Sequence, residues 1–183
     1  MTSEVGVPAW RARYPDLAGR VAVVSGEGEV VPAVVAALAA SGMALAVVGA
    51  SRATVDDAVA SAEANEVAVF GVVADPHAAE VWGRVLPHAE QRLGPIDVLV
   101  AIGASEDRQA AVRAVTPDMG ARRRGVVVEV GDHHALLSLP DAVRHRIVST
   151  VGEVEPDSVG AAVAFCASDV VMLPLVAVEL ATS

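Results

Sequence analysis

The residues best suited to proton transfer lie late in the chain, at Asp132, His133 and His145. Histidine gains and loses a proton near neutral pH and serves as a general acid or base. Asp132 and His133 directly follow an apolar run, and open α/β sheets carry their sites at such strand ends. These residues therefore suggest an isomerase or a hydratase, with a polar loop as the alternative. His134 extends the pair, but no set of Asp, Glu or His at ligand spacing completes it, so we expect no metal site.

A glycine-containing turn near the start of the chain could hold a nucleotide. Ser25, Gly26 and Gly28 close an apolar run, and Gly26-Glu-Gly28-Glu-Val-Val31 matches two-thirds of Gly-x-Gly-x-x-Gly. That motif lets backbone N–H groups approach a pyrophosphate at a helix N-terminus. A partial match has low specificity, so any binding of NAD or NADP predicted from it is weak.

Two later side chains fall where the next strands should end. Arg52 could face an adenosine 2′-phosphate, and Asp75 could hold an adenine amino group. Each also has an ordinary structural explanation, because Arg52 could be a solvated loop residue and Asp75 could cap a helix that starts near Pro76. Cys166 is expected to be a buried thiol on the apolar face of its helix.

Short apolar runs alternate with longer segments of helical period, which predicts βαβ units and a doubly wound parallel sheet. Right-handed crossovers give the strand order 3-2-1-4-5-6-7. The expected strands are Val21–Ser25, Ala44–Gly49, Val67–Val73, Ile96–Ile102, Val126–Val130, Ile147–Val151 and Leu175–Leu180. The expected helices are Val31–Ser41, Ala53–Ala64, His77–Leu93, Glu106–Arg124 with an interruption at Thr116-Pro117, and Asp157–Ser168. Residues 1–16 are predicted to be an extension and residues 17–183 to form one domain.

Composition narrows the classes of partner. The net charge of −10 argues against nucleic acid and anionic membranes. Mean hydropathy is +0.50, and apolar surface that the core does not bury predicts an oligomer. With one cysteine, no signal peptide and no long apolar segment, the sequence predicts a cytoplasmic protein. The chain contains no lysine, so no mechanism that requires one is available.

Six segments, in order, resemble the short-chain dehydrogenase/reductase family, and together they extend from about Leu17 to Leu180. They correspond to its opening strand, its first helix and second strand, the aspartate after its third strand, its fourth and fifth strands, and its last helix. The segments are Leu17-Ala-Gly-Arg-Val-Ala-Val-Val-Ser-Gly26, Leu38-Ala-Ala-Ser-Gly-Met-Ala-Leu-Ala-Val-Val-Gly-Ala-Ser-Arg52, Asp75, Leu93-Gly-Pro-Ile-Asp-Val-Leu-Val100, Arg124-Gly-Val-Val-Val-Glu-Val-Gly131 and Glu155-Pro-Asp-Ser-Val-Gly-Ala-Ala-Val-Ala-Phe-Cys-Ala-Ser-Asp169. The resemblance implies a Rossmann-type fold with NAD or NADP as cofactor.

The nucleotide turn departs from that family's Gly-x-x-x-Gly-x-Gly. Gly26 is kept, but Val30 and Pro32 replace the later glycines. A Cβ at Val30 hinders the approach of a pyrophosphate, and Pro32 lacks an N–H donor. Glu27 and Glu29 add negative charge, and Glu29 is expected to take the phosphate's electrostatic role at the helix N-terminus.

The catalytic residues that the resemblance would require are absent. The family uses a serine, a Tyr-x-x-x-Lys pair and a helper asparagine, whereas the only tyrosine here is Tyr14, before the first strand. Asp132 stands at the serine position, and His145 falls where an ungapped reading would place the tyrosine. The only asparagine is Asn65, far from the helper position.

The segments that should carry catalysis are also short. Leu139–Arg146 has room for one helical turn at most, so the fourth and catalytic helices are expected to be shortened. The sequence therefore predicts a truncated, non-catalytic member of the fold that assembles with itself or with an active short-chain dehydrogenase through Asp157–Leu180. The alternatives are an NAD(P)-dependent oxidoreductase with weak cofactor binding and the isomerase or hydratase described above.

Overall fold

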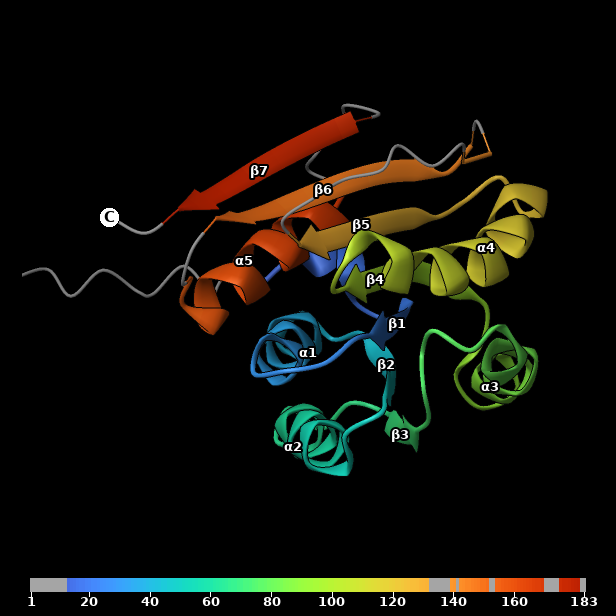
Figure 1. Cartoon of the computed structure of the whole chain (residues 1–183), viewed down its shortest axis with the longest axis horizontal. Helices are drawn as coiled ribbons and strands as arrows, with labels where there is room; N and C mark the ends of the chain where they lie inside the picture. The colour runs from blue at the N-terminus through green and yellow to red at the C-terminus, as the bar shows by residue number, and fades with distance from the viewer. Residues whose placement is uncertain (1–12, 132–138, 141, 152–153, 170–174, 182–183) are drawn as a thin grey trace, which may run out of the picture.

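A seven-stranded parallel sheet forms the centre of the protein, in the order β3-β2-β1-β4-β5-β6-β7. The computed structural model describes residues 13–131, 139–140, 142–151, 154–169 and 175–181. Figure 1 shows β3 and β7 at the two ends of the sheet. This order confirms the predicted doubly wound fold. The strands are β1 (Val21–Ser25), β2 (Ala44–Gly49), β3 (Val69–Val73), β4 (Ile96–Ile102), β5 (Val126–Gly131), β6 (Arg144–Val151) and β7 (Leu175–Ala181).

Helices cover both faces of the sheet. The helices α1, α2 and α5 pack on one face, and α3 and α4 pack on the other (Figure 1). In β1, Ala22 and Val24 face the first group while Val21 and Val23 face the second, so the strand is buried throughout. Among the described residues, no helix has the length and apolar character needed to cross a membrane. The helices are α1 (Val30–Ala40), α2 (Arg52–Glu63), α3 (Ala79–Leu93), α4 (Ser105–Ala121) and α5 (Pro156–Ala167), with a 3-10 turn at Pro15–Leu17 before β1.

Several element boundaries differ from the sequence prediction by one to three residues, and two of these differences have a clear structural cause. The third helix begins at Ala79 rather than His77, because Asp75 and Pro76 form a turn in which the Asp75 carboxylate accepts the His77 N–H (2.9 Å). The sixth strand begins at Arg144, three residues before the predicted start, and pairs with β5 from there. The helical turn suggested for Leu139–Arg146 is therefore wrong for its last three residues, because residues 144–146 belong to β6.

The fourth helix is continuous where the sequence predicted an interruption. It passes through Thr116 and Pro117 without a break. Pro117 cannot donate a backbone hydrogen bond, but it lies on the exposed side of the helix. The Thr116 hydroxyl donates to the Val112 carbonyl (2.8 Å), which satisfies this buried hydroxyl within the helix.

The closest helix contact joins α1 to α5. A Cβ at Gly160 of α5 would lie 2.6 Å from the Ala33 carbonyl oxygen and 3.4 Å from the Ala37 Cβ of α1. Glycine is therefore needed at 160 for the two backbones to approach each other. Gly83 of α3 is also helical, yet a Cβ there would meet nothing within 4 Å. Gly83 therefore serves as a control for Gly160, because both glycines are helical but only Gly160 is in close contact with another helix.

We predict opposite effects of alanine at these two glycines. Gly160→Ala should lower the free energy of unfolding by about 1–3 kcal/mol, because α5 must move away from α1. Gly83→Ala should raise it by up to about 1 kcal/mol, because alanine favours the helix and finds open space. Chemical denaturation measures both, and stabilisation by both substitutions would contradict the close packing described here.

Candidate functional site

The turn after β1 lies against the end of β4. Gly26 has φ +152°, and a Cβ there would lie 2.7 Å from the Ile102 Cβ and 2.8 Å from the Ile102 carbonyl oxygen. Gly28 also has positive φ, at +85°, and directs the chain into α1. Both glycines are therefore required by backbone geometry, whether or not a ligand binds.

The Glu27 side chain reaches across this turn to the carboxyl end of β2. Its carboxylate accepts hydrogen bonds from the backbone N–H of Ala50 and from that of Ser51 (3.3 Å). Ser51 is the N-cap of α2, and its side chain accepts the Thr54 N–H (3.3 Å). An anion carried by the chain itself thus occupies the amides between β2 and α2.

The start of α1 offers few donors. Its N-cap is Glu29, whose side chain makes no capping hydrogen bond, so the predicted electrostatic role of Glu29 has no contact behind it. The Val31 N–H donates to the Gly28 carbonyl (3.2 Å), and Pro32 has no N–H to donate. Glu27, not Glu29, makes amide contacts in this turn, and it makes them just before α2 rather than at α1.

These residues do not fit a dinucleotide in the conformation described. A pyrophosphate needs free N–H groups at the start of α1, and an adenosine ribose needs access to the end of β2. At the start of α1 the Val31 N–H is already bonded within the turn. At the end of β2, the Glu27 carboxylate covers the Ala50 and Ser51 amides. We therefore derive no chemical step through a nicotinamide cofactor.

The remaining residues predicted for a nucleotide lie at the same edge of the sheet. Ser25 ends β1 and is buried, whereas Arg52 begins α2 and is exposed. Asp75 follows β3 and binds the His77 backbone, so it stabilises a turn and does not cap α3. The topology brings these residues, Gly26 and Gly28 to one edge, but none of the hydrogen bonds or ion pairs given for them joins them into a common cluster.

A buried chain of charges crosses the other half of this edge. Glu129 of β5 is 2% exposed, although it lies in the middle of an apolar strand. The Arg108 Nε of α4 donates to its Oε2 (2.9 Å), and the His145 Nε2 of β6 donates to its Oε1 (2.5 Å). The side chain of Arg108 is fully buried and that of His145 is 11% exposed. The carboxylate thereby holds one helix and two strands together.

The charges of its partners keep Glu129 ionised. Burial alone would raise the pKa of this carboxyl, but the hydrogen bond and charge of His145 and the charge of Arg108 outweigh it and lower the pKa. Arg108 also donates from Nη1 to the carbonyls of Gly103 (2.5 Å) and Val130 (3.2 Å). Its guanidinium therefore fills the space between the carboxyl ends of β4 and β5.

Sequence reasoning found only one member of this cluster. The sequence suggests His145 as a general base in a loop, whereas it lies in β6, where its ring binds Glu129. Asp132 and His133 lie outside the described residues, so their proposed convergence with His145 stays a prediction. The sequence contains one sign of this buried cluster, the carboxylate of Glu129 within the otherwise apolar run of residues 126–130.

Two other predicted features can be placed. Cys166 is fully buried, and burial raises the pKa of its thiol to about 11 although the Arg146 guanidinium opposes the change. It is therefore a structural thiol, as predicted. Within the described part of the chain, no group of three His, Cys, Asp or Glu side chains could hold a metal ion.

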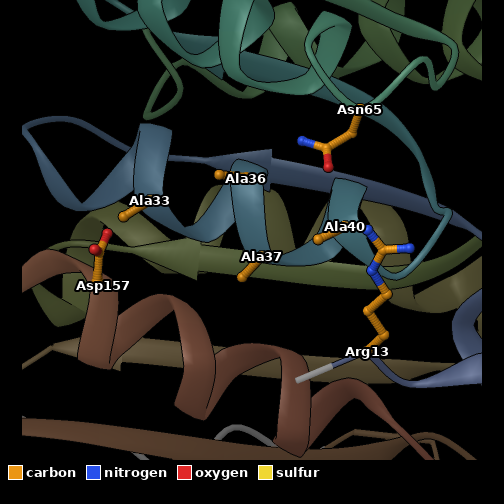
Figure 2. Close-up of a pocket in the computed structure, with 7 residues that line it drawn as sticks. All are labelled: Arg13, Ala33, Ala36, Ala37, Ala40, Asn65 and Asp157. Carbon is orange, nitrogen blue, oxygen red and sulfur yellow. The ribbon is translucent and has the colours of Figure 1, made fainter. Parts of the chain in front are cut away.

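An alanine-lined groove of about 450 Å³ runs along α1. Figure 2 shows the methyl groups of Ala36 and Ala40 on α1, with Asn65, Arg13 and Asp157 around them. The groove lacks a convergent set of polar groups, and it lies away from the buried charges. It therefore offers no chemistry of its own.

Comparison with solved structures identifies the architecture. A metagenomic short-chain oxidoreductase in complex with NADP superimposes with a TM-score of 0.75 at 17% identity, covering 92% of this chain and 99% of that one. A short-chain type dehydrogenase/reductase from Mycobacterium marinum gives 0.77 at 13% identity, covering 91% and 96%. The chain has the fold of the short-chain dehydrogenases.

A third structure with the short-chain dehydrogenase fold, an NAD+-bound xylitol dehydrogenase, gives a TM-score of 0.73 at 15% identity, covering 90% of this chain and 98% of that one. No family model and no curated protein matches the sequence. At these identities the similarity concerns the fold, and function must be argued from the residues of this chain.

We predict that Glu129→Gln destabilises the protein and changes its response to acid. At pH 7 the loss should be about 3–5 kcal/mol, because the Arg108 cation is left buried without its carboxylate. The folded pKa of Glu129 lies below its ordinary value of 4.5, so its contribution to stability is present above pH 4.5 and is lost as pH falls through the folded pKa. Below pH 4.5 the variant should therefore lose stability less steeply.

Urea denaturation measures both effects when it is repeated at several pH values between roughly 3 and 8, a range that includes the titration of carboxyl groups. Asp118→Asn is the control, because Asp118 is 53% exposed and forms only a surface pair with Arg122. The control should lose less than about 1 kcal/mol. Equal losses in the two variants would contradict the structural role of the buried cluster.

Proposed function

We propose that this chain is a non-catalytic protein with the short-chain dehydrogenase fold, which acts by assembling with itself or with an active short-chain dehydrogenase. The observation that carries the proposal is the Glu27 carboxylate on the Ala50 and Ser51 amides. This contact places the negative charge of Glu27 at the end of β2, where the adenosine ribose of a dinucleotide would lie.

The absence of the family's tyrosine and lysine supports the same proposal. The chain has no lysine, and its only tyrosine, Tyr14, precedes β1 and packs against the core beside Phe165. The crossing between β5 and β6 consists of residues 132–143 and contains neither tyrosine nor lysine. Reduction of a carbonyl needs a positioned acid to supply a proton. His145, the histidine beside this crossing, is engaged by Glu129.

Under this proposal the chain binds NAD or NADP weakly at most. The alternative, an oxidoreductase with weak cofactor binding, requires the Glu27 side chain to move away from the Ala50 and Ser51 amides. The single cysteine, which is buried, is in keeping with a cytoplasmic protein.

We place the assembly surface at α5 and β7. Phe165 of α5 is 37% exposed, and β7 is the outermost strand of the sheet beside β6 (Figure 1). Strands in that position pair readily with another chain.

Cofactor binding is tested by thermal unfolding with NADH and NADPH. We expect no stabilisation of the natural protein by either cofactor at a concentration of about 1 mM, which is near the highest KM that enzymes ordinarily show. A cofactor present at 100 times its Kd would raise the free energy of unfolding by about 2.7 kcal/mol. Glu27→Ala frees the Ala50 and Ser51 amides and should increase binding. Glu29→Ala removes the same charge without freeing an amide and should not.

Clear stabilisation of the natural protein, or oxidation of NADPH with a ketone at an ordinary enzymatic rate, would overturn the non-catalytic proposal. Equal gains in binding by Glu27→Ala and Glu29→Ala would instead show that net charge, and not occupation of the amides, limits the affinity.

Assembly is tested by the mass in solution, alone and with a short-chain dehydrogenase. We expect an oligomer that Phe165→Ser weakens, because Phe165 presents apolar surface on α5. Val73→Ser is the matched control, since Val73 is 40% exposed on β3 at the opposite end of the sheet. Light scattering after size exclusion measures the mass. A monomer that captures no dehydrogenase, or equal effects of both substitutions, would contradict the assembly surface.

A further inference from the structure

Arginines converge on a cavity at the amino edge of the sheet, opposite the edge that carries the candidate site. Arg20 precedes β1, Arg124 precedes β5 and Arg144 begins β6. Their side chains line a cavity of about 300 Å³ together with Asp97 and Asp169. The amino ends of four neighbouring strands, β1, β4, β5 and β6, thus meet Asp169 of the chain after α5 at one place.

Each aspartate in this cavity lies between two arginines. Asp169 accepts hydrogen bonds from Arg144 (2.5 Å to Oδ1) and from Arg20. Asp97 forms ion pairs with Arg124 (3.1 Å) and Arg122 (3.6 Å). In each group, two guanidinium groups therefore face one carboxylate of the cavity.

Two further acids lie beside these groups, outside the lining of the cavity. Asp118 pairs with Arg122 on the surface of α4 (2.6 Å), and Asp16 accepts the Asp169 N–H (2.5 Å). Neither lines the cavity, whose own side chains are three arginines and two aspartates. The cavity is therefore positive in a chain whose net charge is −10.

Structural demands account for part of this charge. Arg122 caps the end of α4, where a cation complements the helix dipole, and it donates to the Ile96 carbonyl. Arg20 is only 15% exposed in its pair with Asp169. Arg124 and Arg144 differ, because their side chains are 58% and 30% exposed, and among the described residues each has a single aspartate partner.

Two guanidinium groups with unused donors therefore face one polar cavity. A guanidinium has five N–H donors in a fixed plane, and this geometry matches the oxygens of a phosphate or carboxylate in pairs. The volume of about 300 Å³ accommodates a phosphate group with a small organic substituent.

We propose that this cavity binds a phosphate group, either free or on a small phosphomonoester, through Arg124 and Arg144. The site is separate from the carboxyl edge of the sheet and does not depend on whether a dinucleotide binds there. It makes the amino edge of the sheet a ligand-binding surface in a protein whose other edge has lost its fit to a nucleotide.

Inorganic phosphate and glycerol phosphate are the probes, with acetate as the carboxylate arm and sodium chloride at equal ionic strength as the reference. Titration calorimetry and thermal unfolding should show saturable phosphate binding with Kd in the millimolar range or tighter. Arg124→Gln and Arg144→Gln should each weaken it about tenfold. Arg113→Gln, an exposed α4 arginine that contacts Gln109, should leave it unchanged.

Arg124→Gln keeps Asp97 paired with Arg122, so its fold is expected to persist even if Arg144→Gln loses stability. Binding of glycerol phosphate as tightly as phosphate supports a phosphomonoester ligand, and tighter binding of phosphate alone supports the free ion. The proposal is overturned if phosphate stabilises no more than chloride, if acetate binds as well as phosphate, or if Arg113→Gln weakens binding as much as Arg124→Gln.

Discussion

The carboxylate of Glu129 is the constraint around which one half of the sheet is arranged. An ionised group in the middle of a buried parallel strand is stable only when hydrogen-bonded cations surround it. Arg108 and His145 provide them, from α4 and from β6. The same contacts fix the start of α4, fill the gap between β4 and β5 through Arg108, and set the side chain of His145. Polar groups that could have served a reaction are thus committed to holding secondary structure together.

The two edges of the sheet have opposite character. At the carboxyl edge, where open α/β sheets bind their ligands, Glu27 covers backbone donors and Arg108 closes the strand ends. At the amino edge, Arg124 and Arg144 leave guanidinium donors facing a polar cavity. The charged groups at the carboxyl edge are thus bonded within the chain, whereas two guanidinium groups at the amino edge keep donors for a further partner.

The sequence predicted the sheet well, because each strand is an apolar run that helices bury on both faces. Strand order followed from right-handed crossovers, and the errors were at boundaries, such as the start of α3 at Ala79, and at the predicted interruption of α4. The site was harder. Arg108 and Glu129 are 21 positions apart, and no local pattern pairs them. The predicted sixth strand begins at Ile147 and so leaves out His145, whose burial depends on partners that only the folded chain brings together.

Glu27 shows why a degenerate motif needs a structure. From the sequence, the loss of two glycines and the gain of two acids were equivalent signs of a damaged nucleotide turn, and Glu29 was the acid expected at the helix N-terminus. In the fold, Glu29 makes no capping bond while Glu27 bridges to β2. Hydrogen bonds from two amides to a carboxylate stabilise the backbone that supplies them. Glu27 therefore ties the turn after β1 to the start of α2 from within the chain, whereas Glu29 makes no such contact.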